Sequence, residues 1–273
     1  DLLKNQHPKP HRLRSVLGLG AKNPAIILPD ADLCFTVNEC LLGSLSFNGQ
    51  RCTSLKLLFV HDSIADDFAN RIARGVEQLK IGMPWEDGAT ITPLPDPTKP
   101  AYLRELVIDA QEHGARVLNA EGGSVAKTLF TPAVLYPVTQ KMRVFHEEQF
   151  RPLVAISPFS EIEEPIEYIT TSHYGQQASI FGQNSDEIAK LIDPLVNQVC
   201  RVNINSQCQR GPDIFPFTGR KDSAEGTLSV SDALRVFSIR TLVAAKSNDI
   251  NKKIINQILR ERKSKFLSDD FIL

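Results

Sequence analysis

The sequence lacks long apolar runs and any excess of charge of one sign. Its apolar stretches have the length of a strand and fall far short of the roughly 20 residues that cross a bilayer. Its 31 Lys and Arg against 32 Asp and Glu give a formal net charge of −1, which leaves no nucleic-acid-binding footprint. We therefore expect no membrane span and no nucleic-acid partner.

The sequence also lacks a regular cysteine spacing. Its five cysteines are Cys34, Cys40, Cys52, Cys200 and Cys208. An odd number without a Cys-x-x-Cys pair disfavours a disulfide framework and a structural zinc site, so we predict no metal. Free thiols are typical of a reducing compartment, and we expect the cytoplasm or an organelle matrix. The first residue is Asp1, and we expect that something upstream of it has been processed, cut or left out.

The sequence does contain a regular alternation of apolar runs and amphipathic segments. Its 273 residues, 42% of them hydrophobic, are enough for one large core. Strands are predicted at 25–28, 55–60, 115–118, 133–136, 153–156, 178–181 and 199–204. Helices are predicted at about 30–45, 63–82, 101–113, 163–169 and 186–196, with Ser63 as the N-cap of the second. This alternation predicts an α/β fold with a mostly parallel, covered sheet.

Cys52 is the candidate nucleophile of this sheet. It follows Asn48 and Gly49 in a predicted loop between a helix and a strand, where a side chain can be exposed at the edge of a sheet. Arg51 supplies positive potential that favours the thiolate, the nucleophilic form. The alternative, left open by composition alone, is a small buried core cysteine, because no base partner is visible nearby in the sequence.

Short motifs around Cys52 give the sequence a specific resemblance. Residues 47–53, FNGQRCT, resemble the nucleophile signature of the aldehyde dehydrogenase superfamily. Colinear matches cover residues 16 to about 245, and they include KNPAII at 22–27, EEQF at 147–150, NIN at 203–205 and PFxGxKxS at 216–223. The stretch QRGPDxFPF at 209–217 is similar to the non-phosphorylating glyceraldehyde-3-phosphate dehydrogenases of that superfamily.

The resemblance implies a chemistry and a set of site residues. Cys52 would attack a small-molecule aldehyde, and a hydride would leave to NADP or NAD, giving a thioester that water hydrolyses. Arg51 and Arg210 would face the phosphate of the substrate, because a guanidinium binds phosphate as a planar fork. Glu148 would hold the nicotinamide ribose, and Phe150 would pack beside the ring. The alternatives are a surface arginine at Arg210 and a solvated loop at the Glu-Glu pair.

Three departures from the family's pattern put this activity in question. The motif Glu-Leu-Gly-Gly-Lys begins here with Gly18, and a missing general base typically costs about 10² to 10⁴ in rate. Arg151 replaces a glycine, which often marks a positive φ. Only residues 1–21 precede Lys22, whereas a βαβ unit needs roughly 30 residues or more. A cofactor is therefore expected only if the missing coenzyme domain is supplied. The alternative function is a degenerate, non-catalytic subunit that serves as a structural part of a larger assembly.

The resemblance also divides the chain. Residues 1–15 are predicted to form a basic arm with a remnant of the coenzyme domain, and residues 16–238 the catalytic domain. Residues 239–245 resemble the family's terminal strand, which implies a homo-oligomer or a subunit of a larger assembly. Residues 246–273 are predicted to be an amphipathic extension with a helix that packs on its own domain or dimer mate, or docks another protein. The apolar end at 271–273 favours burial.

Overall fold

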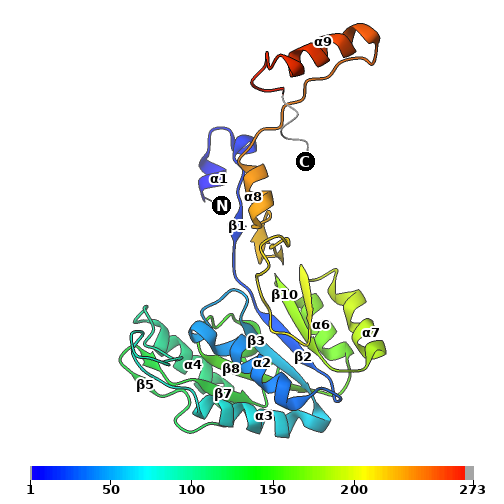
Figure 1. The fold of residues 1–273 in the computed structure, drawn as a ribbon. Coiled ribbons are helices and arrows are strands. Elements are labelled where there is room, and N and C mark those ends of the chain that lie inside the picture. The colour runs from blue at the N-terminus through cyan, green and yellow to red at the C-terminus, as the bar shows by residue number, and fades with distance from the viewer. Residues whose placement is uncertain (1, 268–273) are drawn as a thin grey trace. The chain divides into compact units, whose positions relative to one another are not determined.

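A seven-stranded sheet forms the centre of the computed structural model (Figure 1), which describes residues 2–267. Its strands, in spatial order, are β11 (Arg201–Ile204), β10 (Gln177–Phe181), β2 (Asn23–Ile27), β3 (Leu55–His61), β8 (Leu153–Phe159), β7 (Ala133–Tyr136) and β4 (Arg116–Val117). Every neighbouring pair is parallel except β4 and β7. The predicted α/β class with a mostly parallel sheet is confirmed.

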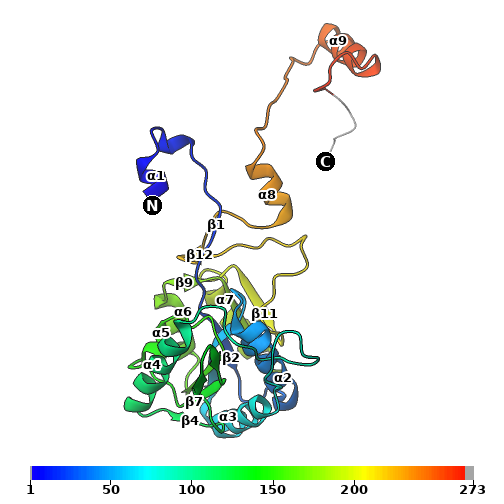
Figure 2. The same ribbon diagram turned by 90° about the vertical axis from the view of Figure 1, so that its left-hand side faces the viewer.

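Helices cover both faces of the sheet, as Figure 2 shows. One layer contains α2 (Leu33–Leu45) and α3 (Asp62–Glu77), and the other contains α4 (Lys99–Glu112), α5 (Arg143–His146), α6 (Glu163–Thr171) and α7 (Ser185–Leu195). Successive strand residues point to opposite faces. Ile26 therefore joins the apolar cluster under α4, whereas Ala25 and Ile27 join the cluster under α2 and α3. The covered sheet explains why the strands are apolar on both faces.

Local capping decides where two of the helices begin. The Asp32 carboxylate accepts a hydrogen bond of 3.1 Å from the Phe35 N–H, as expected for an N-cap. The prediction that Ser63 caps the next helix is wrong. His61 is the N-cap, and its Nδ1 accepts from the Ser63 N–H at 3.3 Å, so α3 begins at Asp62. It also ends at Glu77, before Gly82, the predicted end of the helix.

Several short pairs surround the main sheet. β1 (Leu17–Gly18) pairs with β13 (Ala224–Glu225), β9 (Tyr174–Gly175) with β12 (Arg220–Lys221), and β5 (Val125–Ala126) with β6 (Leu129–Phe130), all antiparallel. The basic arm is exposed and holds a one-turn helix, α1 (Leu2–Gln6), and a 3₁₀ turn at Pro10–Arg12. The helix ends before the first proline, which cannot continue it. The pairing of β1 with β13 joins the segment after the arm to residues about 200 positions later in the sequence.

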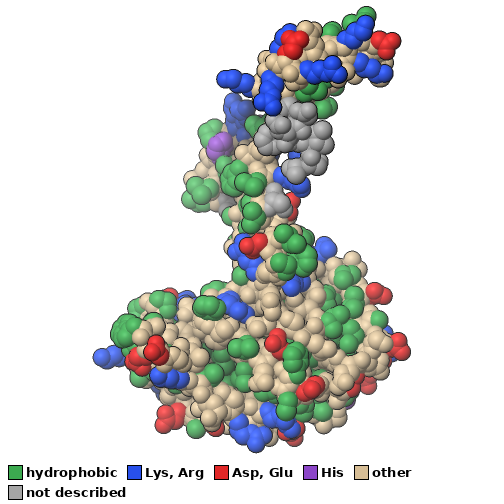
Figure 3. Space-filling model, in the orientation of Figure 1, with side chains coloured by type: hydrophobic (Ala, Val, Ile, Leu, Met, Phe, Trp, Pro, Cys, Tyr) green, Lys and Arg blue, Asp and Glu red, His purple; other side chains and the backbone are tan. Residues whose placement is uncertain are grey.

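The chain divides into two units, Asp1–Ala233 and Leu234–Leu273. α8 (Val230–Val236) crosses that boundary, and α9 (Asp249–Arg260) lies in the second unit, where Lys and Arg side chains gather over it in Figure 3. The predicted helix of the extension is confirmed. Residues 239–245 have no regular secondary structure, so their role as an oligomerisation strand stays a prediction, and residues 271–273 lie outside the described residues. No described helix is long and apolar enough to cross a membrane.

Candidate active site

The amino ends of the parallel strands lie along one edge of the sheet, here called the amino edge. Cys52 lies just before β3, Asn23 begins β2, and Glu148 and Phe150 precede β8. Because β2, β3 and β8 are neighbours, these residues meet although about a hundred positions separate them in the sequence. The fold therefore brings Cys52 to the same edge as Glu148 and Phe150.

The loop that carries the thiol has a strained backbone whose conformation is fixed by its surroundings. Phe47, Asn48 and Gly49 all have positive φ, at 55°, 57° and 65°. A Cβ on Gly49 would lie 2.7 Å from the carbonyl oxygens of Ser44 and Arg151, so only glycine fits there. The Asn48 side chain holds the loop by accepting from the Thr92 N–H at 2.9 Å. Strain of this kind persists only where the surroundings fix it, as at functional loops.

Asn23 holds the main chain at Cys52 and directly after it. Its Nδ2 donates to the carbonyl of Cys52 at 2.7 Å and to the carbonyl of Ser54 at 3.1 Å. Its Oδ1 accepts from the Gln177 N–H at 3.1 Å, which links the loop to β10. Cys52 itself is half-buried, with its side chain neither sealed in the core nor fully exposed. The alternative of a buried core cysteine does not apply to this residue.

Arg51 lies beside the thiol with its guanidinium half-buried. Nη2 donates to Oε1 of Gln207 at 3.1 Å, and Nε is buried without a partner among the described residues. Burial lowers the pKa of Arg51, and the nearby thiols of Cys208 and Cys52 oppose that shift. A buried N–H without a partner is costly, so the hydrogen-bonding capacity of this guanidinium is not fully used within the described residues.

Arg210 lies on a segment that returns to the amino edge. The carbonyl of Gln209 accepts from Nε2 of Gln177 at 2.8 Å and from Nη1 of Arg201 at 3.1 Å, and these two residues begin β10 and β11. The Arg210 side chain is exposed, and its guanidinium lies 5.1 Å from the centroid of the Phe217 ring. Arg210 and Arg51 therefore belong to one edge of the sheet, but their guanidinium groups have different partners.

Glu148 has one engaged carboxylate oxygen and one free oxygen. Oε1 accepts from the Ala21 N–H at 3.0 Å and pairs with Lys56. Oε2 accepts no hydrogen bond from any described residue, and a Cβ added to Gly20 would lie 3.0 Å from it. The alternative of a solvated loop does not apply to Glu148, because its carboxylate is held by a backbone amide and a buried ammonium.

Phe150 and Arg151 form the turn that precedes β8. Phe150 has a φ of 36°, and its ring lies 5.8 Å from the Arg151 guanidinium carbon and 4.9 Å from Nζ of Lys56. The Arg151 guanidinium folds back and donates to the carbonyl of Phe150. The strained φ therefore falls one residue before the substituted glycine, and Arg151 needs no left-handed backbone. The Arg151 side chain instead packs against the ring of Phe150, the residue that the resemblance places beside the nicotinamide.

Two buried lysines at this edge were not predicted as site residues. Lys56 lies inside β3, and Lys22 precedes β2, where its Nζ donates to the Val144 carbonyl and to Oε1 of Gln149, each at 2.6 Å. Burial, and then the charge of Lys56, holds the pKa of Lys22 well below its ordinary value. The signal available in the sequence was a single lysine inside an otherwise apolar strand, because such a residue must find partners in the core.

Gly18 occupies the place of the family's general base and lies in β1. Its neighbour Leu19 donates to the Ser223 carbonyl at 3.0 Å, so the segment is held as an edge pairing. A Cβ at Gly18 would lie 3.2 Å from the Leu228 side chain. The nearest carboxylate on the paired strand, Glu225, already accepts from Ser15 and pairs with Lys4. No carboxylate replaces the missing one within these two paired strands.

A half-buried thiol in a fixed loop, with an arginine beside it and a carboxylate just before the neighbouring strand, is the arrangement expected of an α/β protein with a cysteine nucleophile. Residues 5–243 match the aldehyde dehydrogenase family, and the chain belongs to that family.

Curated relatives of the chain make this assignment more specific. The chain is 39% identical to an NADP-dependent glyceraldehyde-3-phosphate dehydrogenase of Streptococcus equinus, over 85% of this chain and 47% of that protein, and 33% identical to the Arabidopsis thaliana enzyme of that name, over 82% and 45%. The chain spans about half the length of these curated relatives.

Solved structures give the same picture. The crystal structure of NADP-dependent glyceraldehyde-3-phosphate dehydrogenase from Bacillus halodurans C-125 complexed with NADP is 42% identical, with a TM-score of 0.76, and the match covers 80% of this chain and 45% of that one. The Methanocaldococcus jannaschii enzyme complexed with NADP is 31% identical, with a TM-score of 0.79, over 85% and 50%.

Proposed function

We propose that this chain carries the nucleophile of an NADP-dependent dehydrogenase that oxidises a phosphorylated aldehyde, with glyceraldehyde 3-phosphate as the first candidate, to the acid. The observation that carries this proposal is the half-buried Cys52 in a loop fixed by Gly49 and Asn23, beside a guanidinium with an unpartnered Nε. The names of the relatives support the substrate and the cofactor. The proposal concerns the whole protein, because this chain spans only about half the length of these relatives.

The residues of this chain supply the covalent part of the reaction. The Cys52 thiolate adds to the aldehyde carbon and forms a thiohemiacetal, whose oxyanion the Cys52 backbone N–H can stabilise. That N–H donates to no other backbone group in the described residues. Arg51 and Arg210 bind the phosphate at the other end of the substrate, which fixes the carbonyl at the thiol. Loss of a hydride leaves a thioester on Cys52, and water then releases the acid.

The amino edge also fits the nicotinamide end of a cofactor. Oε2 of Glu148 is free to accept a hydrogen bond from a ribose hydroxyl, while Oε1 is held by the Ala21 N–H. The Phe150 ring lies beside it and offers an apolar surface. When bound, NADP supplies the acceptor for the hydride. The resemblance assigns its adenosine half to a preceding domain, so the cofactor is proposed for a protein that contains both parts.

The first test replaces the thiol. In a protein supplied with glyceraldehyde 3-phosphate and NADP, Cys52→Ser should lower the rate of NADPH formation by about a thousandfold or more. Cys34→Ser is the matched control, because Cys34 is an exposed thiol on α2, away from the amino edge. Full activity in Cys52→Ser would remove the proposal.

The second test concerns the missing base. Gly18→Glu should speed release of the acid by about 10² to 10⁴ if thioester hydrolysis limits turnover, because it restores a carboxylate at the family's position. Mass spectrometry of the Cys52 peptide should then show less acyl adduct at steady state. The alternative of a purely structural subunit receives no support from the comparisons, and an acyl adduct on Cys52 in the unchanged protein would exclude it.

The exposed apolar residues of the second unit support an oligomer. Ile239 is 90% exposed and Leu242 is 85% exposed in the segment that resembles the family's terminal strand. An exposed apolar segment of this kind is typical of a strand that pairs with another chain. Light scattering should report a mass at least twice that of the chain, and Leu242→Lys should lower it. A monomer in both cases would remove this part of the proposal.

A further inference from the structure

Lys56 is a charged residue in the middle of an apolar strand. Its side chain is 2% exposed, and its neighbours in β3, Leu55 and Leu57, are buried core residues. A buried ammonium is costly unless it is paired and hydrogen-bonded. Its partners should therefore explain why the strand carries it.

The Lys56 ammonium contacts the two segments that frame the site. Nζ donates to the Ala21 carbonyl at 2.8 Å and pairs with Oε1 of Glu148. It lies 4.9 Å from the centroid of the Phe150 ring. The Glu148 oxygen that it contacts also accepts the Ala21 N–H, so the backbone of Ala21, the Glu148 carboxylate and the Lys56 ammonium hold each other.

We propose that Lys56 is a positioning residue of this site, which fixes the Glu148 carboxylate with Oε2 free and adds a positive charge to the surroundings of the Cys52 thiol. The inference deepens the proposed function and rests on it, because Glu148 is the residue proposed to bind the ribose. A cation fixed beside a thiol favours both the thiolate and an anionic reaction partner.

The titratable groups that act on Lys56 or on its partner Glu148 include Lys22, Arg151 and the thiols of Cys52 and Cys208. Burial lowers the pKa of Lys56, and the Glu148 carboxylate, followed by the Cys52 thiol, opposes that shift. Cys52 lies just before β3 and Lys56 near its beginning, so both residues belong to the amino edge.

Lys22 offers a matched control for a purely structural role. It is an equally buried lysine at the same edge, but its Nζ donates to Val144 and Gln149 and not to Glu148. Lys56→Met and Lys22→Met both remove a buried ammonium, but only the first removes the ammonium that is paired with Glu148.

The experiment compares two reagents of different charge. Cys52 is alkylated with neutral iodoacetamide and with anionic iodoacetate, and the rates are followed by mass spectrometry of the peptide that contains it. The ratio of the two rates cancels the thiolate fraction and reports the local potential. Lys56→Met should lower the iodoacetate-to-iodoacetamide ratio by about threefold to tenfold. Lys22→Met should leave the ratio within about twofold of the unchanged protein.

A double variant identifies the partner. In Lys56→Met the Glu148 carboxylate loses its counterion and repels the anionic reagent, so Lys56→Met with Glu148→Gln should recover most of the ratio. Should Lys56→Met fail to fold, Lys56→Gln keeps donors for the Ala21 carbonyl and for Glu148 and should give the same fall.

Two results would overturn the inference. The first is an iodoacetate-to-iodoacetamide ratio in Lys56→Met and Lys56→Gln that equals the ratio of the unchanged protein. The second is a fall of this ratio in Lys22→Met as large as the fall in Lys56→Met. Neither result depends on NADP or an aldehyde. A Cys52 that reacts with neither reagent would instead count against the proposed function itself, and the inference would fall with it.

Discussion

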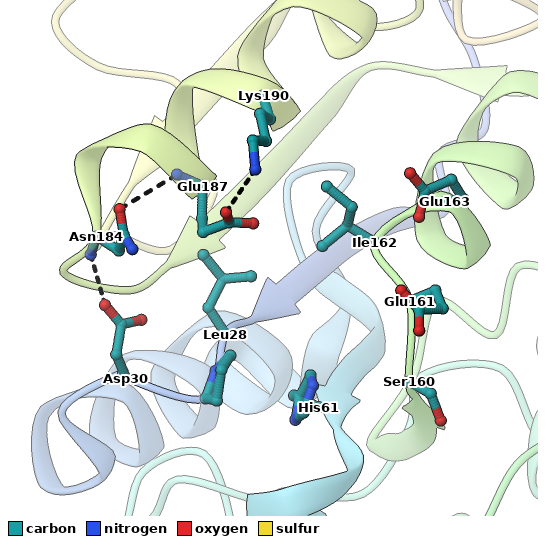
Figure 4. A pocket seen from close by; sticks show the side chains of 11 residues that line it. Leu28, Asp30, His61, Ser160, Glu161, Ile162, Glu163, Asn184, Glu187 and Lys190 are labelled. Carbon is teal, nitrogen blue, oxygen red and sulfur yellow. Dashed lines mark hydrogen bonds and ion pairs between the residues drawn. The ribbon is translucent and has the colours of Figure 1, made fainter.

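The two edges of the sheet have opposite characters. At the carboxyl edge, a cavity of about 410 Å³ is lined by residues that follow four strands (Figure 4). Several of its polar groups bind each other and the backbone. The Asp30 carboxylate accepts from the N–H groups of Gln183 and Asn184, Asn184 caps α7, and Glu187 pairs with Lys190 at 2.7 Å. At the amino edge, by contrast, lie a half-buried thiol, two buried lysines and a carboxylate with a free oxygen.

This difference shows that the position of a site is not given by the fold alone. Open α/β sheets usually bind ligands outside the carboxyl ends of their strands. Here the acidic side chains of the carboxyl edge serve the N-termini of the helices that start there, which is a structural task. The amino edge holds two buried lysines and a loop with three consecutive positive φ angles. A buried oxygen without a partner among the described residues also occurs at the carboxyl edge, in Asp30, so the candidate site is located by the half-buried Cys52 thiol and the strained loop that carries it.

The largest expected effect tests the strained loop of the amino edge. Gly49→Ala should destabilise the fold by about 3 kcal/mol or more, because the new Cβ would meet two backbone oxygens at 2.7 Å in a left-handed conformation. Gly114→Ala is the control, since Gly114 also has a positive φ but nothing lies within 4 Å of its Cβ. It should cost only about 1 kcal/mol. Urea unfolding measures both, and equal losses would show that the loop can relax.

Sequence patterns predicted the elements well because each strand is buried on both faces. The runs at Ala133–Tyr136 and Leu153–Phe159 were identified by apolar content alone, with at most three residues of error at their ends. The motif around Cys52 identified the thiol. The capping of α3 by His61 was missed because Ser and Asp are the commoner caps, and both follow it directly.

The contacts of the site could not be predicted, because they depend on which strands are neighbours. Asn23 reaches the Cys52 carbonyl only because β2 lies beside β3. Lys56 reaches Glu148 only because β8 lies on the other side of β3. The chain order of these segments does not reveal that adjacency. The stacking of Arg210 on Phe217 is likewise a property of how a long loop folds back.

A second prediction compares one asparagine at each edge. Asn23→Ala should lower the free energy of unfolding by about 2 to 4 kcal/mol, because it leaves two carbonyls and one N–H of the buried loop without partners. Asn184→Ala, which removes the exposed cap of α7, should cost about 1 kcal/mol. Urea unfolding and Cys52 alkylation should both respond to the first variant and only unfolding to the second. Equal costs at the two edges would contradict the comparison.

A third prediction uses the buried thiol behind the amino edge. Burial raises the pKa of Cys208 from 9.0 to about 12, and its Sγ lies 3.4 Å from Oγ of Ser179. The pKa of Cys208 is higher in the folded than in the unfolded chain. The buried thiol therefore contributes to the stability of the fold fully below about pH 9, and this contribution is lost as the pH rises toward 12. The slope is at most about 1.4 kcal/mol per pH unit for one group. Cys208→Ala should flatten the alkaline loss of stability, whereas Cys34→Ala, at an exposed thiol, should leave it unchanged.

The smallest expected effect belongs to the carboxyl edge. Lys190 and Glu187 form an ion pair of 2.7 Å three residues apart on α7, with 60% and 36% of their side chains exposed. Water screens such a pair and side-chain entropy opposes it, so Lys190→Ala should move Tm by less than about 1 °C, and 1 M salt should abolish even that shift. Lys56→Met removes the same kind of pair at the amino edge, where the lysine is 2% exposed and the abandoned carboxylate stays partly buried. Thermal melts of the two variants at low and high salt therefore isolate burial as the variable. A salt-insensitive loss of several degrees in Lys190→Ala would mean that the cavity at the carboxyl edge depends on its charges as strongly as the thiol site does.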